Sequence, residues 1–399
     1  MYNIKLTNYV PKPEPVTSDY LICAHYYAAW KKKCALLHEG FDDLHDYPER
    51  TPLAGYYDEG NPVYSDWEIK WAVEHGINCF IHCWYRYKEN VGKPVTREGL
   101  RCAHGLHDGF FNAKYEQMIN FAIMFECSPR WGSTNPDDLM ENLMPYWLDT
   151  YFKRGNYLVI DNKPVLFVFQ WRELLKVLGT PEEQKRSFDL CREYCRQRGF
   201  DGMIFAAEEK FYNKEVKDEI LNSGYDFAFS YNWDYNDDDN SEQTLIKKHC
   251  DFFENSIGLD PKFYITTASC FWDSEPRTTD HWVKELGYAY NERKTWYFMP
   301  DAFRKALKNC KRMTDALPQE NQGRNIIMID NWNEWDEGHY IAPSHRFGFK
   351  YLQAIREELT HCDNLPDYRM PQDIGLSNFN ETWDTPDLRE NCIKKFGVE

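Results

Sequence analysis

Short apolar, β-prone runs recur along the chain, and each ends in polar and aromatic residues before a stretch whose apolar positions have helical spacing. Hydrophobic strands that alternate with helices predict a parallel sheet buried on both faces. Eight such units predict that the α/β sheet closes into a single (β/α)8 barrel of the TIM type with long βα loops. The predicted strands span residues 20–24, 77–81, 121–125, 164–169, 202–206, 226–230, 262–267 and 325–329.

Proline positions mark the starts of several predicted helices, because the first turn of a helix tolerates a residue without an N–H. Helices are expected from Pro136, Pro181 and Pro300, and a further helix at 62–75. No Gly/Ser linker, low-complexity run or short repeat marks an internal boundary, so residues 1–399 are predicted to form one catalytic domain. An N-terminal extension at 1–19 and a surface-packed tail at 361–399 are expected to flank the barrel.

Charge narrows the set of partners. The 47 basic and 64 acidic residues give a formal net charge of -17, which repels phosphate backbones, so nucleic acid is not an expected partner.

No run approaches the roughly 20 apolar residues that span a bilayer, so no membrane span is expected. The first 20 residues lack a signal-peptide pattern, which predicts a cytoplasmic protein as the sequence stands, or a periplasmic or secreted one if a signal peptide was removed.

The residues that follow the predicted strands should converge on one face of the barrel, where barrel enzymes carry their catalytic groups. They are rich in carboxylates, aromatic rings, His and Arg, a set that fits an oligosaccharide or polysaccharide substrate with many hydroxyls and apolar ring faces. The candidate substrate-binding residues are His25, Tyr27, His82, Trp84, Tyr85, Glu126, Arg130, Trp131, Gln170, Trp171, Glu208, Tyr231, Trp233, Asp234, Trp272, Asp273, Arg277, Asn333, Trp335 and Tyr340.

Glu334 and Glu337 are the candidate catalytic residues. They lie three apart after the last predicted strand, in the sequence Asn-Trp-Asn-Glu-Trp-Asp-Glu-Gly. Cleavage of a glycosidic bond needs one group that protonates the leaving oxygen and another that supports attack at the anomeric carbon. Two neighbouring carboxyl groups in partly apolar surroundings should have different pKa values, so that one can act as the acid and the other as the base. The alternative is structural, with Glu337 capping a following helix and Glu334 in a salt bridge.

Other candidates also have structural alternatives. Glu126 and Glu208 could orient sugar hydroxyls or form ion pairs at the barrel rim with Arg130 or Lys210. A histidine at a strand end is as often a hydrogen-bonded support as a ligand. No His-x-His or His-Glu-x-x-His pattern occurs, and the acidic run 234–239 lacks the Gly and terminal Glu of a calcium loop, so no metal site is expected. No phosphate-binding Gly-rich loop or Gly-x-Ser-x-Gly elbow occurs, so no cofactor is expected.

The stretch 331–356 resembles the C-terminal signature of the family 99 glycoside hydrolases and their WbsX-type relatives, in which Asn-Glu-Trp-x-Glu-Gly precedes a Pro and a helix. Further likeness runs through segments at 55–58, 76–85, 157–168 and 272–277. The resemblance implies a (β/α)8 barrel and, for the hydrolases, retaining endo-action on α-mannosides in which the sugar's own 2-hydroxyl attacks the anomeric carbon. By position, Glu334 is similar to the base for that hydroxyl, Glu337 to the acid and base at the glycosidic oxygen, and Glu126 to a hydroxyl-orienting carboxylate.

The segment 25–30 departs from the Pro-Gln-Phe-His of many WbsX-type relatives, and the loop 30–51 is individual, so the identity of the sugar stays open. Three functions remain: a glycoside hydrolase, a glycosyltransferase of polysaccharide or O-antigen assembly, and a sugar-binding barrel without catalysis. The presence of both carboxylates disfavours the third, and the absence of a nucleotide-phosphate loop together with the acidic charge favours hydrolysis over transfer.

Overall fold

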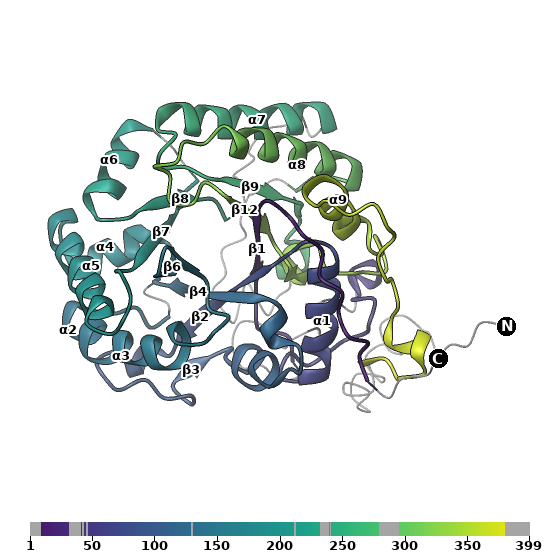
Figure 1. The fold of residues 1–399 in the computed structure, drawn as a ribbon, viewed down its shortest axis with the longest axis horizontal. Helices are drawn as coiled ribbons and strands as arrows, with labels where there is room; N and C mark the ends of the chain where they lie inside the picture. Colours follow the sequence, from purple (N-terminus) through teal and green to yellow (C-terminus); the bar gives the residue numbers. More distant parts are fainter. Residues whose placement is uncertain are drawn as a thin grey trace.

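A computed structural model shows a ring of strands inside a ring of helices (Figure 1). It describes residues 9–31, 41, 44, 47–128, 131–210, 213–231, 239, 241–278 and 295–379. The parallel strands follow the order β8-β7-β6-β4-β2-β1-β12-β9, and the two end strands meet where Ala228 pairs with Tyr264. The sheet is therefore a nearly closed barrel, and the predicted fold is confirmed. The barrel strands are β1 Leu21–Tyr26, β2 Cys79–Arg86, β4 Asn120–Glu126, β6 Lys163–Phe169, β7 Ile204–Glu208, β8 Phe227–Phe229, β9 Thr266–Ser269 and β12 Ile326–Asp330.

Short antiparallel strands extend the barrel. β3 (Leu100–Arg101) pairs with β2 and β5 (Val159–Ile160) with β6, while β10 (Phe271–Trp272) pairs with β11 (Trp296–Tyr297) and β13 (Asn333–Glu334) with β14 (His339–Tyr340). The helices cover the outside of the barrel (Figure 1). They are α1 Pro62–Glu74, α2 Pro136–Asp138, α3 Met144–Trp147, α4 Trp171–Leu178, α5 Pro181–Arg196, α6 Lys214–Asn222, α7 Glu242–Leu259, α8 Pro300–Asp315 and α9 Lys350–Leu359.

Helices begin where the prolines predicted. Pro136, Pro181 and Pro300 are the first residues of α2, α5 and α8. Thr180 caps α5 in a capping box with Glu183. None of the helices within the described ranges is long and apolar enough to cross a membrane.

Two strand boundaries differ from the prediction for physical reasons. Strand β7 begins at Ile204 instead of residue 202, because Gly202 has a φ of 143°, which does not belong to a strand. Strand β2 continues to Arg86, five residues past its predicted end, because β3 adds the antiparallel pairs Tyr85 with Arg101 and Arg86 with Leu100. The longer β2 carries its last residues beyond the barrel sheet toward the loops.

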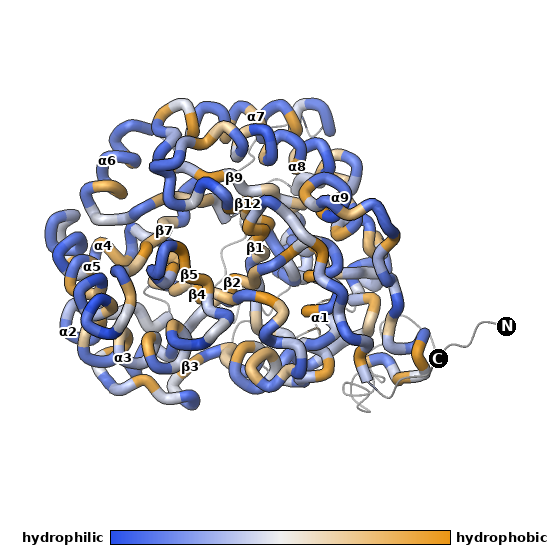
Figure 2. Tube along the Cα trace, viewed as in Figure 1, coloured by the Kyte–Doolittle hydropathy of each residue, from blue (hydrophilic) through white to orange (hydrophobic). Residues whose placement is uncertain are grey.

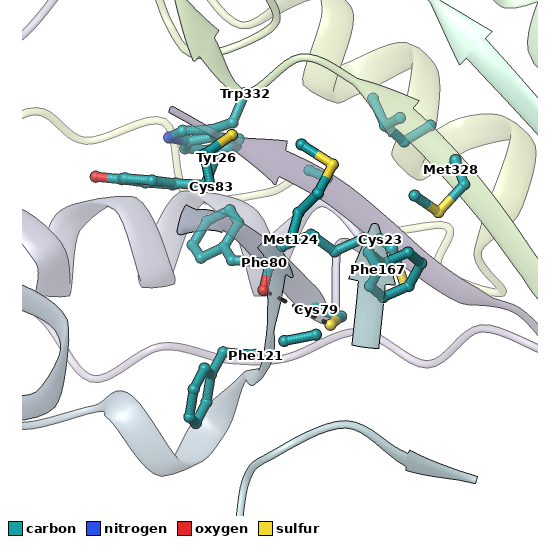
Figure 3. Close-up of a cluster of buried hydrophobic side chains, with 14 of the residues drawn as sticks. Cys23, Tyr26, Cys79, Phe80, Cys83, Phe121, Met124, Phe167, Met328 and Trp332 are labelled. Carbon is teal, nitrogen blue, oxygen red and sulfur yellow. Dashed lines mark hydrogen bonds between the residues drawn. The ribbon is translucent and has the colours of Figure 1, made fainter. Parts of the chain in front are cut away.

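Successive residues of a strand point alternately into the barrel and toward the helices. Cys23 pairs in register with Cys79 on one side and Met328 on the other, and these side chains share the barrel interior (Figure 3). Tyr26 points the other way, since its hydroxyl donates to Glu68 of α1 at 2.7 Å. Apolar residues dominate the central strands, whereas the helices alternate between apolar and polar residues (Figure 2). Both faces of the sheet are thus buried.

The segments at the two ends of the described chain pack on α1. The Val16 N–H donates to Val73 O at 3.0 Å, and the Trp71 indole N–H donates to Arg369 O at 3.4 Å. Lys70 of α1 forms an ion pair with Asp367 at 3.0 Å. Residues 367–369 thus contact α1, while 380–399 and 1–8 lie outside the described residues. The assignment of the whole chain to one catalytic domain stays a prediction.

Candidate active site

A tight hairpin after β12 carries the two candidate catalytic glutamates. In β13 and β14, Asn333 pairs with Tyr340 and Glu334 with His339, and a single turn at Trp335–Glu337 joins the strands. Gly338 closes the turn with a φ of 55°, and a Cβ there would lie only 2.8 Å from the Asp273 carbonyl oxygen. The segment is therefore a compact hairpin held against β10, and no helix follows Glu337 that it could cap.

Arg277 brings together three carboxylates of this hairpin. Its guanidinium donates to Glu334 Oε1 at 2.8 Å, to Asp336 Oδ2 at 2.7 Å and to Glu337 Oε1. All four side chains are buried. One guanidinium thus holds Glu334 and Glu337 side by side in a site of low solvent access, where electrostatic interactions are strong.

Burial and the neighbouring charge of Glu337 raise the pKa of Glu334 well above its ordinary value, while Arg277 opposes the shift. The other oxygen of Glu334, Oε2, accepts a hydrogen bond from the Tyr231 hydroxyl at 3.0 Å and another from Asn331 Nδ2 at 3.4 Å. Two carboxylates this close cannot both lose their protons easily. Loss of the proton from Glu334 is therefore disfavoured, while Tyr231 and Asn331 fix the orientation of its carboxyl group.

A second pair of carboxylates stands at the ends of β4 and β7. Burial raises the pKa of Glu126 to about 7, the Ser128 backbone N–H opposes this with a hydrogen bond of 2.7 Å, and the charge of Glu208 adds to the rise. The Cys83 thiol lies near both pairs of carboxylates. Burial is the main cause of its raised pKa, and the charges of Glu334 and Glu126 add to the rise. The carboxylates at the ends of β4 and β12 thus face one common space.

Several predicted residues line this space. Tyr27 and Tyr85 both lie close enough to Glu334 for its charge to contribute, after burial, to the rise in their pKa values. The Tyr231 ring makes edge contacts with His25 at 4.9 Å and with Phe169 at 5.3 Å. The structure therefore brings together His25, Tyr27, Tyr85, Glu126, Glu208, Tyr231, Arg277, Glu334 and Glu337. Whether any of them contacts a substrate stays a prediction.

Two predictions of residues that face the site are wrong in orientation. His82 packs on Phe110 at 5.3 Å, outside the strand ring. Trp84 packs on Trp147 of α3 at 5.6 Å. Each follows an inward residue of β2 by one position, so the pleat turns it toward the helices. Both side chains therefore belong to the layer between sheet and helices.

Four further aromatic candidates are also buried. Trp171 donates its indole N–H to Glu209 at 2.9 Å, and Trp335 donates its own to Tyr57 at 2.8 Å. Tyr340 is fully buried, and Trp272 packs edge-on against His339 at 5.8 Å. These contacts favour a supporting role in this conformation, because a ring without exposed surface has no face to offer to a sugar.

Polar candidates divide into anchors and exposed groups. Asp273 accepts a hydrogen bond from the buried Arg50 at 2.6 Å, which ties the loop of Arg277 to residues 47–50. Asn333 accepts the Tyr27 backbone N–H at 2.8 Å and so joins β1 to the hairpin. Gln170 is exposed at the end of β6 in the left-handed region, with a φ of 56°. Arg130, Trp233 and Asp234 lie outside the described residues.

Sequence reasoning missed four residues of the site. Asn331 and Asp336 lie in the same motif as the two glutamates. Nothing in the sequence of that motif indicates that Asn331 contacts Tyr231 and that Asp336 contacts Arg277. Glu59 is buried and accepts hydrogen bonds from Asn333 Nδ2 at 2.8 Å and from the Trp30 N–H at 3.0 Å. Phe169, the last residue of β6, is partly exposed beside Tyr231. Among the residues that the structure describes, no group of three or more His, Cys, Asp or Glu could hold a metal ion.

Comparison with solved structures supports the same architecture. A protein described as "Glycoside hydrolase-like protein" superposes with a TM-score of 0.61 at 16% identity, covering 90% of this chain and 98% of its own. The GH99 endo-alpha-mannosidase from Bacteroides thetaiotaomicron superposes with a TM-score of 0.54 at 15% identity, covering 96% of this chain and 100% of its own. At such low identity the likeness shows the fold alone, a barrel shared with family 99 glycoside hydrolases.

Curated relatives come from two strains of Xanthomonas campestris pv. campestris. Each is described as "Uncharacterized protein WxcX" and is 20% identical over 382 residues, or 90% of this chain. The chain spans about half the length of these relatives, since the alignment covers 50% of each. The family model described as "Glycosyltransferase WbsX" matches residues 133–355, more than half of the chain and including the whole hairpin with both glutamates. The resemblance seen in the sequence is thereby confirmed, and the chain belongs to the WbsX family, a family related to the family 99 glycoside hydrolases.

Proposed function

We propose that this chain is a glycoside hydrolase that cleaves an α-linked, α-mannoside-like glycan with retention of configuration. The observation that carries the proposal is the pair Glu334 and Glu337 on one guanidinium, at the C-terminal end of a barrel strand. Arg277 holds both carboxyl groups at one place, which supports a reaction that uses them together. Retention of configuration is what the family resemblance implies.

The proposed reaction uses the sugar's own 2-hydroxyl, as the family resemblance implies. Glu334 takes the proton of this hydroxyl. At the same time, the oxygen of the 2-hydroxyl forms a bond to C1. The bond from C1 to the leaving oxygen breaks, and Glu337 gives its proton to that oxygen. Water then attacks C1 and opens the three-membered ring, Glu337 takes a proton from the water, and Glu334 returns its proton to the 2-oxygen. Two displacements at C1 retain configuration, and both carboxyls end as they began.

The electrostatics of the site fit this sequence of steps. The reaction needs one proton on the pair when substrate arrives, and burial together with the neighbouring carboxylate disfavours the loss of both protons. Tyr231 and Asn331 donate to Glu334 Oε2, and donors stabilise the ionised form of a carboxyl group. They therefore oppose part of the effect of burial on Glu334 and support its proposed role as the base.

Two conservative variants test the roles separately. Glu337→Gln removes the acid, which matters only when the leaving oxygen needs a proton, so activity should fall on oligosaccharides but much less on a nitrophenyl glycoside. Glu334→Gln removes the base and should lose activity on both substrates, by several kcal/mol in transition-state free energy. Steady-state kinetics on α-mannosides, α-glucosides and α-rhamnosides, with product anomers read by NMR, makes the measurement.

Glu116→Gln provides the matched control. Glu116 is also a carboxylate paired with arginine, at 2.9 and 3.0 Å from Arg154, but it precedes β4 at the opposite end of the barrel. This variant should keep wild-type kinetics. Equal losses for Glu337→Gln on both substrate types would remove Glu337 as the acid, and an active Glu334→Gln would overturn the assignment of the base.

A glycosyltransferase is the second candidate, favoured by the description of the family model as "Glycosyltransferase WbsX". A transferase binds an activated donor such as a nucleotide sugar. Ligands that bind the native state raise the unfolding temperature, so thermal shifts with nucleotide sugars and with free oligosaccharides separate the two functions. Stabilisation by oligosaccharides alone is expected. Stabilisation by nucleotide sugars with transfer to an acceptor would replace the hydrolase proposal.

A further inference from the structure

An arginine stacks on a partly exposed tryptophan beside the carboxylate site. The Arg101 guanidinium lies 4.1 Å from the centre of the Trp131 ring and 5.0 Å from that of Tyr87. Tyr85 approaches the same indole edge-on, at 6.3 Å and an interplanar angle of 84°. Tyr85 and Arg101 are also paired across β2 and β3. We call Tyr85, Trp131 and Arg101 the aromatic platform.

The backbone around Trp131 is fixed by close contacts. The Trp131 N–H donates to Ser128 O at 3.1 Å, and the next N–H, of Gly132, donates to Arg86 O at 2.9 Å. A Cβ on Gly132 would lie 2.7 Å from Arg86 Cγ and 2.8 Å from the Tyr87 carbonyl oxygen, so the loop lies directly on β2. The buried Arg86 in turn donates to Ser133 O at 2.9 Å and pairs with Asp138 of α2. These contacts hold the backbone of Trp131 and Gly132 against β2.

Tyr85 connects this platform with the carboxylates. Its hydroxyl is near enough to Glu126 and Glu334 for both charges to add to the effect of burial and raise its pKa. Tyr85 and Trp131 both keep part of their surface exposed, unlike Trp84 and Trp335. Tyr85 thus lies between the carboxylates and Trp131, near the extended end of β2.

We propose that Tyr85 and Trp131 form a subsite for a second sugar ring, one residue away from the bond that is cleaved. This inference rests on the proposed glycoside hydrolase function and makes the substrate class more specific: the protein acts on oligosaccharides and binds single-sugar glycosides poorly. Sugar rings have apolar faces that pack on flat aromatic surfaces, and a preorganised surface loses little entropy on binding. Arg101 covers one face of the indole and holds it in place, which is the role of a positioning residue.

Binding of intact glycans to the Glu337→Gln variant tests the subsite. The probes are α-linked manno-, gluco- and rhamno-oligosaccharides of one to five sugars, immobilised as an array. Affinity should rise from one sugar to two. Adding Trp131→Ala should weaken binding of the longer glycans about tenfold, equivalent to about 1.4 kcal/mol, and leave single-sugar binding unchanged. Trp131→Phe, which keeps a flat ring, should restore most of the gain with chain length.

The control is Tyr194→Ala, on α5. Arg198 lies 3.5 Å from the centre of the Tyr194 ring, so the same kind of stacked pair is removed from the outer helices, and glycan binding should not change. If Trp131→Ala does not fold, Arg101→Gln tests the same platform by releasing the indole, and should also reduce the gain with chain length.

The outcomes separate the two proposals. An unchanged gain with chain length in a folded Trp131→Ala or Arg101→Gln variant overturns the subsite and leaves the hydrolase proposal intact. No binding of any probe by Glu337→Gln, together with no cleavage by the wild-type protein, overturns the hydrolase proposal and the subsite with it. A gain with chain length that Trp131→Ala abolishes and Trp131→Phe restores supports both.

Discussion

Glu68 is a buried carboxyl group that should make the stability of this barrel depend on pH. It lies on α1, and its oxygens accept hydrogen bonds from the Tyr26 hydroxyl at 2.7 Å and from the Trp332 indole N–H at 2.8 Å. Burial raises its pKa from the ordinary 4.5 to about 8, and these hydrogen bonds oppose only part of the rise. Trp332 stands two residues before Glu334, so Glu68 supports the start of the hairpin that carries the candidate glutamates.

The sign of the effect follows from the raised pKa. Below pH 4.5 Glu68 is protonated in both the folded and the unfolded chain, so its ionisation does not lower the free energy of unfolding. Between pH 4.5 and about 8 the unfolded chain releases it while the folded chain keeps it, so the free energy of unfolding falls as pH rises. The loss amounts to about 3 kcal/mol at neutral pH and approaches about 5 kcal/mol once the folded carboxyl also ionises.

Glu68→Gln should remove this loss, because the amide stays neutral at every pH and, like a protonated carboxyl, both donates and accepts. Relative to wild type, the variant should gain about 4 kcal/mol in the free energy of unfolding between roughly pH 5 and pH 9. Urea unfolding at several pH values measures the difference. Glu116→Gln, which breaks an exposed-side ion pair with Arg154, should show no such gain. A difference between Glu68→Gln and wild type that does not change with pH would refute the reasoning.

Three further predictions follow from the site. Because burial raises the pKa of Glu126 to about 7, kcat/KM should rise with pH as this group ionises near neutral pH. Glu126→Gln should flatten this rising part of the pH profile, and an unchanged rise would mean that another group titrates there. Arg277→Met leaves three buried carboxylates without their shared partner, so it should cost about 3–5 kcal/mol in urea unfolding, and a wild-type midpoint would contradict this. Treatment with EDTA should leave activity intact, as the lack of metal-binding motifs predicts, and a loss that calcium or zinc restores would overturn that expectation.

The barrel could be predicted because its signals are local. Each strand is a short apolar run, and prolines mark the first turns of α2, α5 and α8. The boundaries of the strands were less accessible, because they depend on partners distant in sequence. Strand β2 extends to Arg86 only because β3 pairs with it. No property of residues 82–86 alone indicates that extension.

The orientation of side chains at the strand ends could not be predicted. A strand with one buried face alternates between apolar and polar residues, and that alternation identifies the inner face. Strand β2 reads Cys-Phe-Ile-His-Cys-Trp-Tyr-Arg, which has large apolar residues at both parities, because both the barrel interior and the layer under the helices exclude water. Trp84 and Tyr85 were therefore equal candidates, and only the packing of Trp84 on Trp147 separates them.

The candidate pair could be chosen from the sequence, but the groups that surround it could not. Glu334 and Glu337 are three residues apart, whereas Arg277 reaches Glu334 from 57 residues away and Tyr231 from 103. The structural reading of Glu334 as a salt-bridge partner and the catalytic reading are therefore compatible. An ion pair with a single carboxylate would lower that group's pKa, but Arg277 is divided among three carboxylates, and the pKa of Glu334 stays raised. One guanidinium thus holds three carboxylates together, while burial, the largest influence, keeps the pKa of Glu334 raised despite that positive charge.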